Sequence, residues 1–424
     1  MVAALALASC TGTPGPTASS PDGSAGPSMP SATTTLPIAA ASETEAPLVT
    51  ALASAGPGTS PTATASLPAP SGAWRPAPTQ ASLTGTQLQD VVWTGSRFEA
   101  VGGASFLDSV DGRTWRSATV GATNGDVSRI ASGPGGLVVI GTVEGYAASW
   151  ASTDAIHWSW HSRNFPTSLA RGDVFRVTDV VATATGWLAV GREDPACNFN
   201  CGLSPVRGLA WISSDGLTWT RVTGQIAFDG GGIEAVDATD SGFVAVGGAG
   251  GHAAIWSSPD GLSWSRVADD PVFAPPSGAG GDSVVEAIGV AVGHGAIVAV
   301  GQAFDAGPGG APVVMAWRSV DGASWTAASV AGATGGQVFS VAATVSRFLA
   351  TGPSGDGSCL GGIWASSDGA GWACEATDQA FAGFGPYAAA GSPTIEVAVG
   401  LTSVGWDDSS GQGLPGAAWW RPAP

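Results

Sequence analysis

Six aspartates recur along the chain within one short pattern, Ser-x-Asp-Gly-x-x-Trp. A repeated set of carboxylates is a candidate binding or catalytic feature, so its local setting has to be considered first. The six are Asp111, Asp154, Asp215, Asp260, Asp321 and Asp368. One copy departs from the pattern, because Ala155 stands where the other five have glycine.

The residues around each aspartate are typical of a tight hairpin turn. An Asp-Gly step supplies the positive φ that such a turn needs. The aspartate carboxylate and the serine hydroxyl can both accept hydrogen bonds from nearby backbone N–H groups. We therefore interpret the six aspartates as structural parts of turns, and not as a catalytic set.

A second repeated element precedes each of these turns. It runs from an apolar residue to a glycine eleven positions later, and both strands of a hairpin fit inside it. The seven copies are Val91–Gly102, Ile130–Gly141, Val180–Gly191, Val236–Gly247, Val290–Gly301, Val341–Gly352 and Ala389–Gly400. They recur about every fifty residues, a period typical of repeat folds.

Tryptophans mark the same unit. Each of the six turns ends on one, and five copies carry a second tryptophan two residues before the serine, where the first copy has Leu107. A four-stranded unit of this size cannot bury both of its faces alone, so the units must pack on each other in a ring. The sequence predicts an all-β fold, a seven-bladed β-propeller with four-stranded antiparallel blades, over residues 71–424.

The repeated turns resemble the Asp-box, or bacterial neuraminidase repeat, although the usual Asp-box is written Ser-x-Asp-x-Gly-x-x-Trp. The resemblance covers roughly residues 71–424 and implies a sialidase-like propeller with the turns on its outer rim. It implies no single function, because Asp-boxes occur in sialidases, other glycosidases, receptors and assembly factors.

Function in a propeller usually comes from the mouth of the central channel. The candidate binding residues on the predicted inner strands are Asp90, Arg129, Asp179, Glu234, Glu286 and Tyr387, with Asp237 beside them. A sialidase of the resembled family uses three arginines, a tyrosine nucleophile with a glutamate partner, and an aspartate acid–base group. Here Tyr387 would be the nucleophile, and Glu234 or Glu286 its partner.

The sialidase set is incomplete in this chain. Arg129 is the only arginine well inside a predicted inner strand, and Arg97 and Arg347 lie in predicted turns. The sequence also lacks an Arg-Ile-Pro signature before the first turn. We therefore expect no catalytic residues, no sialidase turnover and no cofactor.

The other chemistries have weaker support. The four histidines include no His-x-x-x-His pair on a helix, and the glycine-rich loops cannot be P-loops because the chain has no lysine. Four cysteines, Cys197, Cys201, Cys359 and Cys374, permit three pairings, of which the two local ones close most easily. We expect a Cys359–Cys374 disulfide and, with more strain, Cys197–Cys201, rather than a zinc site.

The N-terminal residues predict export. Residues 1–10 end in Leu7-Ala8-Ser9-Cys10, which resembles the lipobox of bacterial lipoproteins and would place a lipid on Cys10. The apolar run before it is short and lacks basic residues, so we expect the true start to lie upstream. Residues 11–70 are almost entirely Ser, Thr, Pro, Ala and Gly, which predicts a disordered linker.

Composition narrows the function further. Fifteen basic residues, all arginine, stand against 33 acidic ones, giving a net charge of −18, which argues against nucleic acid as a partner. Only 11% of residues are charged while Gly reaches 64 and Trp 18 of the 424 residues, which argues against long amphipathic helices.

These observations favour a monomeric, non-enzymatic binding or scaffold protein, lipid-anchored on the outer side of a bacterial membrane. Its ligand would be a protein, a peptide or a cell-wall glycan. The alternative is a sialidase-like glycoside hydrolase. We also expect the segment around Trp74 to supply the outer strand of the last blade, because the seventh copy ends at Trp420-Arg-Pro without a fourth strand.

Overall fold

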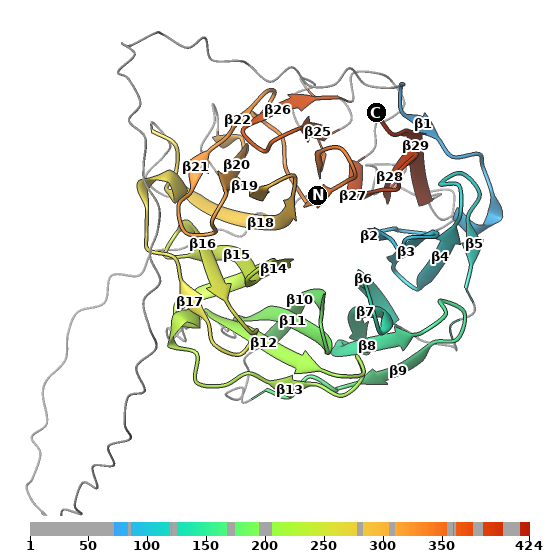
Figure 1. Ribbon diagram of the computed structural model, residues 1–424, viewed down its shortest axis with the longest axis horizontal. Helices are drawn as coiled ribbons and strands as arrows, with labels where there is room; N and C mark the ends of the chain where they lie inside the picture. The colour runs from blue at the N-terminus through green and yellow to red at the C-terminus, as the bar shows by residue number, and fades with distance from the viewer. Residues whose placement is uncertain are drawn as a thin grey trace, which may run out of the picture. The chain divides into compact units, whose positions relative to one another are not determined.

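The computed structural model describes residues 72–83, 86–118, 120, 125–167, 174–194, 206–277, 283–304, 310–353, 359, 362–375, 385–401 and 416–424. Residues Ala65–Pro424 form one compact unit. Its strands make seven sheets arranged in a ring around a central axis (Figure 1). The seven-bladed β-propeller expected from the repeat is confirmed.

The strands of each blade run from the channel outward in chain order. Blade 1 consists of β2 (Asp90–Trp93), β3 (Phe98–Gly102), β4 (Ser105–Ser109) and β5 (Arg116–Ser117); blade 2 of β6 (Gly125–Gly133), β7 (Gly136–Val143), β8 (Tyr146–Ser152) and β9 (Ser159–Ser162); and blade 3 of β10 (Val174–Thr183), β11 (Gly186–Asp194), β12 (Arg207–Ser213) and β13 (Thr220–Arg221). Blade 4 consists of β14 (Gly231–Thr239), β15 (Gly242–Ala249), β16 (His252–Ser258) and β17 (Ser265–Arg266); and blade 5 of β18 (Val284–Gly293), β19 (Ala296–Phe304), β20 (Val313–Ser319) and β21 (Thr326–Ala327). Blade 6 consists of β23 (Ser340–Ala343), β24 (Phe348–Thr351), β25 (Ile363–Ser366) and β26 (Gly371–Cys374); and blade 7 of β27 (Gly385–Gly391), β28 (Ile395–Leu401) and β29 (Gly416–Pro422).

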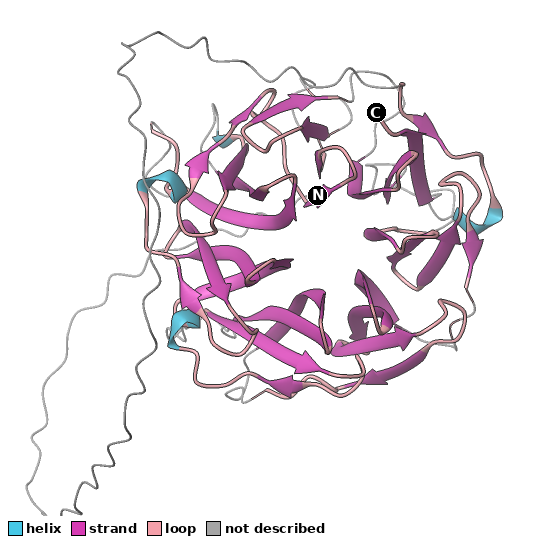
Figure 2. Cartoon of the chain, in the orientation of Figure 1, coloured by secondary structure: helices cyan, strands magenta, loops and turns pink. Residues whose placement is uncertain are grey.

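Three single helical turns, η1 (Ala81–Leu83), η2 (Ile226–Phe228) and η3 (Pro271–Phe273), lie on the rim of the ring (Figure 2). Among the described residues, no helix is long and apolar enough to cross a membrane.

The repeated turns have the predicted hydrogen bonds. In blade 3, the Asp215 carboxylate accepts from the backbone N–H groups of Leu217 and Thr218 at 2.8 and 2.7 Å, and from the Ser213 hydroxyl at 3.0 Å. Gly216 then adopts a φ of 73°. Blade 2 reaches the same conformation with Ala155 at a φ of 63°, a left-handed position that disfavours alanine.

Two large apolar side chains from each blade fill its interface with the preceding blade. One comes from the third strand and the other follows the repeated turn, as Trp211 and Trp219 do between blades 2 and 3. The corresponding pairs are Leu107 and Trp115, Trp150 and Trp158, Trp256 and Trp264, Trp317 and Trp325, Trp364 and Trp372, and Trp419 with Trp74. The repeated tryptophans are therefore the side chains that fill the interfaces between blades.

The N-terminal segment closes the ring, as the sequence predicted. Strand β1 (Arg75–Pro76) pairs antiparallel with β29, so that Arg75 lies opposite Trp420. Trp74, which precedes it, is 3% exposed and packs with Trp419 and with residues of blade 6. Trp74 thus takes the place that the tryptophan after the repeated turn takes in the other six blades.

Four buried charged side chains lie at this closure, and we call them the seam quartet: Arg347 and Glu375 from blade 6, Glu396 and Arg421 from blade 7. Arg347 donates to Glu396 at 3.0 and 2.6 Å, and Arg421 donates to it at 2.8 Å. Both arginines also contact Glu375. Arg421 lies opposite Glu396 in the strand pairing of blade 7. At the equivalent position, the other blades have the turn serine opposite an apolar residue, such as Phe348 in blade 6.

Blade 6 differs from the expected four strands. A short strand β22 (Ser329–Val330) pairs in parallel with β26 and gives this sheet a fifth strand. The chain leaving blade 5 provides it, because the Ser329 and Ala331 N–H groups donate to Ala370 and Trp372. The Cys359–Cys374 disulfide in the same blade is confirmed, with a Cα–Cα distance of 5.5 Å. Cys10, residues 11–70 and the Cys197–Cys201 pair lie outside the described residues.

Replacing the closing tryptophan should destabilise the whole ring. Trp74→Ala leaves a cavity between blades 6 and 7, and we expect the free energy of unfolding to fall by about 3–5 kcal/mol. Trp93→Ala, which removes a half-buried tryptophan of blade 1, is the control and should cost clearly less. Urea unfolding followed by circular dichroism measures both, and equal midpoints for Trp74→Ala and the unaltered chain would contradict this account.

Candidate functional site

The central channel is narrow and mostly apolar. Its cavity of about 430 Å³ is lined by β2, β6, β10, β14, β23 and β27. Most of its wall consists of valine and alanine, and Asp90 and Asp237 are the carboxylates that line it. Whether these carboxylates are available to a ligand depends on their hydrogen bonds.

Three aspartates of the inner strands connect adjacent blades. Asp90 accepts from its neighbour Val91 at 2.8 Å and from Ile130 of blade 2 at 2.9 Å. Asp179 makes the same pair of bonds with Val180 and with Val236 of blade 4. Asp237 does so with Ala238 and with Val292 of blade 5. Both oxygens of each carboxylate are therefore used to hold backbone N–H groups.

Burial raises the pKa of all three carboxyls. The pKa of Asp179 rises to about 7 and that of Asp237 to about 6, because desolvation outweighs the hydrogen bonds. The pKa of Asp90 is raised by the same cause, opposed by the charge of Arg129. Arg129 lies at the equivalent position of blade 2, between Asp90 and Asp179 in the order of blades, and also lowers the pKa of Asp179.

These contacts revise the sequence interpretation of Asp90, Arg129 and Asp179. Asp90 begins β2, whereas Arg129 and Asp179 lie within β6 and β10. The two aspartates hold backbone N–H groups of the adjacent blade. The physical reason is that a backbone N–H at the inner edge of a blade needs an acceptor, and the neighbouring blade's aspartate supplies one.

A charged cluster at the mouth joins blades 3, 4 and 5. Arg192, near the end of β11, contacts the Glu234 carboxylate of β14 and donates to Glu286 of β18 at 2.7 Å. Each of these side chains is between 21% and 26% exposed, so solvent reaches all three. We call them the mouth cluster. Because both carboxylates contact one nitrogen, their nearest oxygens lie within about 6 Å, twice a hydrogen-bond length.

The two carboxylates of the mouth cluster interact through this shared cation. Burial and the charge of Glu286 raise the pKa of Glu234 to about 7, while Arg192 and Arg176 lower it. A carboxyl with a pKa near neutrality can exchange a proton or accept a cationic group, as groups in functional sites do.

Sequence reasoning found Glu234 and Glu286 but missed Arg192 and Arg176. The inner strand β10 begins at Val174, before the apolar residues from which the sequence predicted it. Arg176 therefore also belongs to an inner strand, and it pairs with Arg192 across the hairpin. A usable signal was present, because Arg192 directly follows Gly191, the glycine that ends the repeated element, where blades 1 and 4 have another glycine.

Within the described part of the chain, Tyr387 contacts Phe339 through its ring and makes no hydrogen bond to Glu234 or Glu286. It lies on β27 of blade 7, and its ring stacks on Phe339 with centroids 4.7 Å apart. Burial raises the pKa of its hydroxyl, which disfavours the phenolate that a nucleophile needs. The enzyme alternative would need Glu234 or Glu286 as the partner of Tyr387, and both of these glutamates contact Arg192.

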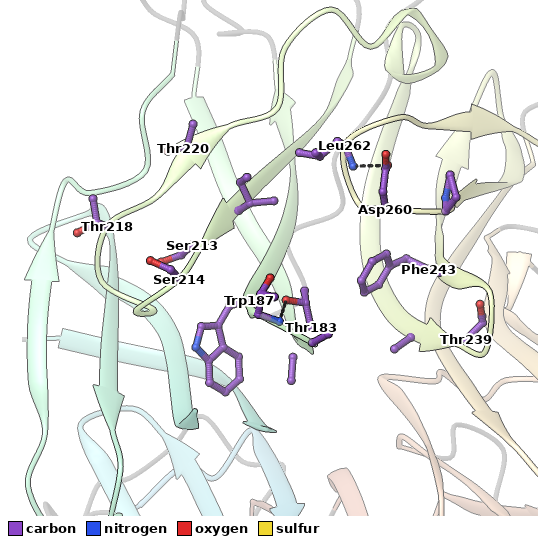
Figure 3. A pocket seen from close by; sticks show the side chains of 17 residues that line it. Thr183, Trp187, Ser213, Ser214, Thr218, Thr220, Thr239, Phe243, Asp260 and Leu262 are labelled. Carbon is purple, nitrogen blue, oxygen red and sulfur yellow. Dashed lines mark hydrogen bonds between the residues drawn. The ribbon is translucent and has the colours of Figure 1, made fainter. Parts of the chain in front are cut away.

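A larger groove lies on the opposite face, between the repeated turns of blades 3 and 4. Its volume is about 730 Å³, and its lining includes Trp187, Phe243 and several threonines (Figure 3). Asp260, the carboxylate that lines it, is bonded to the N–H groups of Leu262 and Ser263. The Asp260 carboxylate therefore serves the turn, and the mouth cluster, where charged groups of three blades meet, is the better candidate site.

Two further observations concern the chemistry of histidine and metals. His157, inside the blade 2 turn, pairs with Asp154 at 2.7 Å. In the described residues, no group of three or more His, Cys, Asp or Glu side chains could hold a metal ion.

Comparison with known proteins supports the fold alone. No family model matches the chain, and no curated protein matches it. Among solved structures, a catalytically inactive virginiamycin B lyase from Staphylococcus aureus with quinupristin has a TM-score of 0.52 at 8% identity, covering 82% of this chain and 98% of that one. A streptogramin B lyase has a TM-score of 0.50 at 8% identity, with coverages of 82% and 97%.

An ancestral GH74 enzyme is also similar, with a TM-score of 0.46 at 14% identity over 80% of this chain and 48% of that one. The two lyases are similar to this chain in fold alone, and identities this low carry no assignment of activity.

Removing the cation of the mouth cluster should make stability more dependent on pH. The pKa of Glu234 is higher in the folded chain than its ordinary value, so its contribution favours folding in acid and is lost as pH rises through about 7. Arg192→Met raises that pKa further. Between pH 5 and 8, the variant should lose about 1–3 kcal/mol more unfolding free energy than the unaltered chain.

Urea titrations at the two pH values measure this difference. Arg116→Met, which removes an exposed arginine on β5, is the matched control and should leave the pH dependence unchanged. The same pH dependence in Arg192→Met and in the control would contradict the proposed role of Arg192.

Proposed function

We propose that this chain is a non-enzymatic binding or scaffold protein that holds a protein, peptide or cell-wall glycan ligand at the channel mouth of blades 3–5. The single observation that carries the proposal is the mouth cluster. There, two carboxylates and one arginine from three blades meet at a solvent-accessible surface. Polar groups placed on rigid strands with access to solvent are what a binding site requires.

The aspartates of the channel wall also support the channel mouth as the binding site. Asp90, Asp179 and Asp237 are engaged with the neighbouring blade's backbone, which leaves the mouth as the place where charge is accessible. The repeated turns also resemble Asp-box propellers, a group that includes receptors and assembly factors as well as enzymes. A binding role is consistent with that resemblance.

A glycoside hydrolase is the second candidate, and one observation favours it. Glu234 and Glu286 are close enough to act as a carboxylate pair, and the pKa of Glu234 is raised to about 7, as a general acid needs. Against this, Arg192 contacts both carboxylates and occupies the space between them. The raised pKa of Tyr387 also opposes the sialidase mechanism in particular.

Turnover and binding assays on the same purified chain separate the two candidates. We expect no hydrolysis of a fluorogenic sialoside, and binding on a glycan or peptide array that weakens about tenfold in Glu286→Gln, since a charge-assisted contact is lost. Tyr387→Phe, distant in the ring, should bind as the unaltered chain does. Hydrolysis above blank that disappears in Tyr387→Phe or Glu234→Gln would establish the enzyme instead.

We further propose that the protein acts outside the cytoplasm, attached to a bacterial membrane by a lipid on Cys10. The Leu7-Ala8-Ser9-Cys10 pattern suggests the attachment, and the Cys359–Cys374 disulfide is compatible with an oxidising compartment. The chain expressed in bacteria with its N-terminal residues intact should partition with membranes, and Cys10→Ser should release it. Equal membrane association of the two forms would contradict lipid anchoring.

A further inference from the structure

A small cleft opens between blades 1 and 2, on the face that carries the repeated turns. Its volume is about 220 Å³. One side consists of the β2–β3 hairpin and β3 of blade 1, including Arg97 and Glu99, and the other of the β6–β7 hairpin and the Asp154 turn of blade 2. The cleft lies apart from the mouth cluster, which belongs to blades 3–5.

Glu99 occupies a position that is aliphatic in every other blade. The equivalent residues, two after the hairpin turn on the second strand, are Val138, Leu188, Val244, Val298, Leu349 and Val397. In four of these blades the glycine of the next blade's turn lies against this residue, which is Val138, Leu188, Val298 or Val397. A Cβ added to Gly216 would lie 2.2 Å from Val138, and one added to Gly369 would lie 2.4 Å from Val298.

The turn that faces Glu99 is also the exceptional one. Blade 2 has Ala155 where the other turns have glycine. Two departures from the repeat therefore meet at one interface, and between them lies the cleft. A carboxyl that replaces an aliphatic side chain in a packed interface reduces stability unless it serves another purpose.

Glu99 is buried without a hydrogen-bond partner for one of its oxygens. The residue is 3% exposed, and within the described part of the chain its Oε1 accepts no hydrogen bond. The nearest cation is the Arg97 guanidinium, whose Nε lies 3.7 Å from Oε1, beyond hydrogen-bond distance. A buried polar atom that lines a cleft and lacks a partner is available to a ligand.

We propose that this cleft binds a neutral, hydroxyl-rich ligand the size of one sugar ring or a small polyol, through Glu99 and Arg97. A hydroxyl can donate to Glu99 Oε1 and accept from the guanidinium, so one ligand group bridges the gap between them. Hydroxyls of Thr94, Ser96 and Ser132 also line the cleft and provide further partners.

The electrostatics of the cleft favour a neutral ligand over an ion. Burial and the charge of Asp108 raise the pKa of Glu99 to about 8, so near pH 7 its carboxyl is mostly protonated and both donates and accepts. Arg97 repels a cation at the entrance, where its side chain is 36% exposed. Asp154, on the opposite side, is paired with His157 and disfavours an anion.

The size of the cleft agrees with this class. Its volume equals that of roughly seven water molecules at about 30 Å³ each, which is enough for one hexose ring but below the usual range for drug-sized ligands. The proposal is independent of the mouth cluster, so its failure would not affect the proposed function there.

Saturation-transfer NMR with D-glucose, D-mannose, N-acetyl-D-glucosamine and myo-inositol, at pH 7, tests the proposal on the whole chain. We expect transfer to at least one of the four. Glu99→Val, which restores the aliphatic residue of the other blades, should weaken that binding about tenfold or more. Glu99→Gln keeps the shape and both hydrogen-bonding roles, and should bind within about threefold of the unaltered chain.

Glu144→Gln, which changes an exposed glutamate in the turn between β7 and β8, is the control and should leave binding unchanged. No transfer to any of the four compounds, or undiminished transfer in Glu99→Val, would overturn the proposal.

Thermal unfolding checks the buried carboxyl independently of any ligand. Because the folded-state pKa of Glu99 is raised, its contribution is favourable in acid and is lost as pH rises through about 8. The midpoint temperature of the unaltered chain should therefore fall more between pH 6 and 9 than that of Glu99→Val or Glu99→Gln. An identical fall in all three would show that Glu99 is not buried as described, and would also overturn the proposal.

Discussion

The structure depends on the packing of each blade against its neighbours, because a four-stranded sheet cannot bury both of its faces alone. Each interface is filled by two large side chains from one blade, set by the third strand and by the residue after the repeated turn. In blade 7 that turn is missing, and Trp74 reaches the same place from the other end of the folded unit. Ring closure is therefore a condition for the stability of all seven interfaces.

The closure between blades 6 and 7 buries charged side chains, of which Arg347, Glu396 and Arg421 are at most 1% exposed. In the seam quartet, two arginines and two glutamates balance each other, and each glutamate contacts both arginines. A buried pair of this kind contributes little net stability compared with apolar packing, but breaking it is costly because an uncompensated charge remains buried. We infer that the quartet specifies which strands close the ring, while Trp74 and Trp419 provide the apolar burial.

The same rigid ring accounts for both candidate sites. Aspartates on the inner strands hold adjacent blades together, so the walls of the channel are fixed and accessible charge is concentrated at the mouth. Each candidate site contains a residue that departs from the repeat. Arg192 follows a repeat glycine, and Glu99 replaces an aliphatic residue. Neither change improves the packing of its blade, which is why both are candidates for function.

The sequence predicted the fold well because its signal is local and repeated. The eleven-residue spacing, the turn pattern and the tryptophans recur in almost every blade. Trp74-Arg75 has the same residue pair as Trp115-Arg116, which showed that it could be an outer strand. The sites were harder to predict, since Arg192, Glu234 and Glu286 come from three blades and meet only once the ring is built. Asp90 and Asp179 looked accessible because nothing in the sequence shows that a neighbouring backbone N–H uses their second oxygen. The seam quartet had a signal, as Arg421 stands in the seventh copy where the other six have the turn serine.

The central claim, that closure between blades 6 and 7 holds the entire ring, is tested most directly by hydrogen exchange. Arg421→Met leaves the remaining quartet with an unbalanced buried carboxylate, which weakens the closure without altering blades 1–5 directly. Exchange measured by mass spectrometry should accelerate together in the inner strands of all seven blades, because opening at the seam exposes the ring as one cooperative unit. Acceleration confined to β23–β29, with unchanged protection in β2–β20, would contradict the claim.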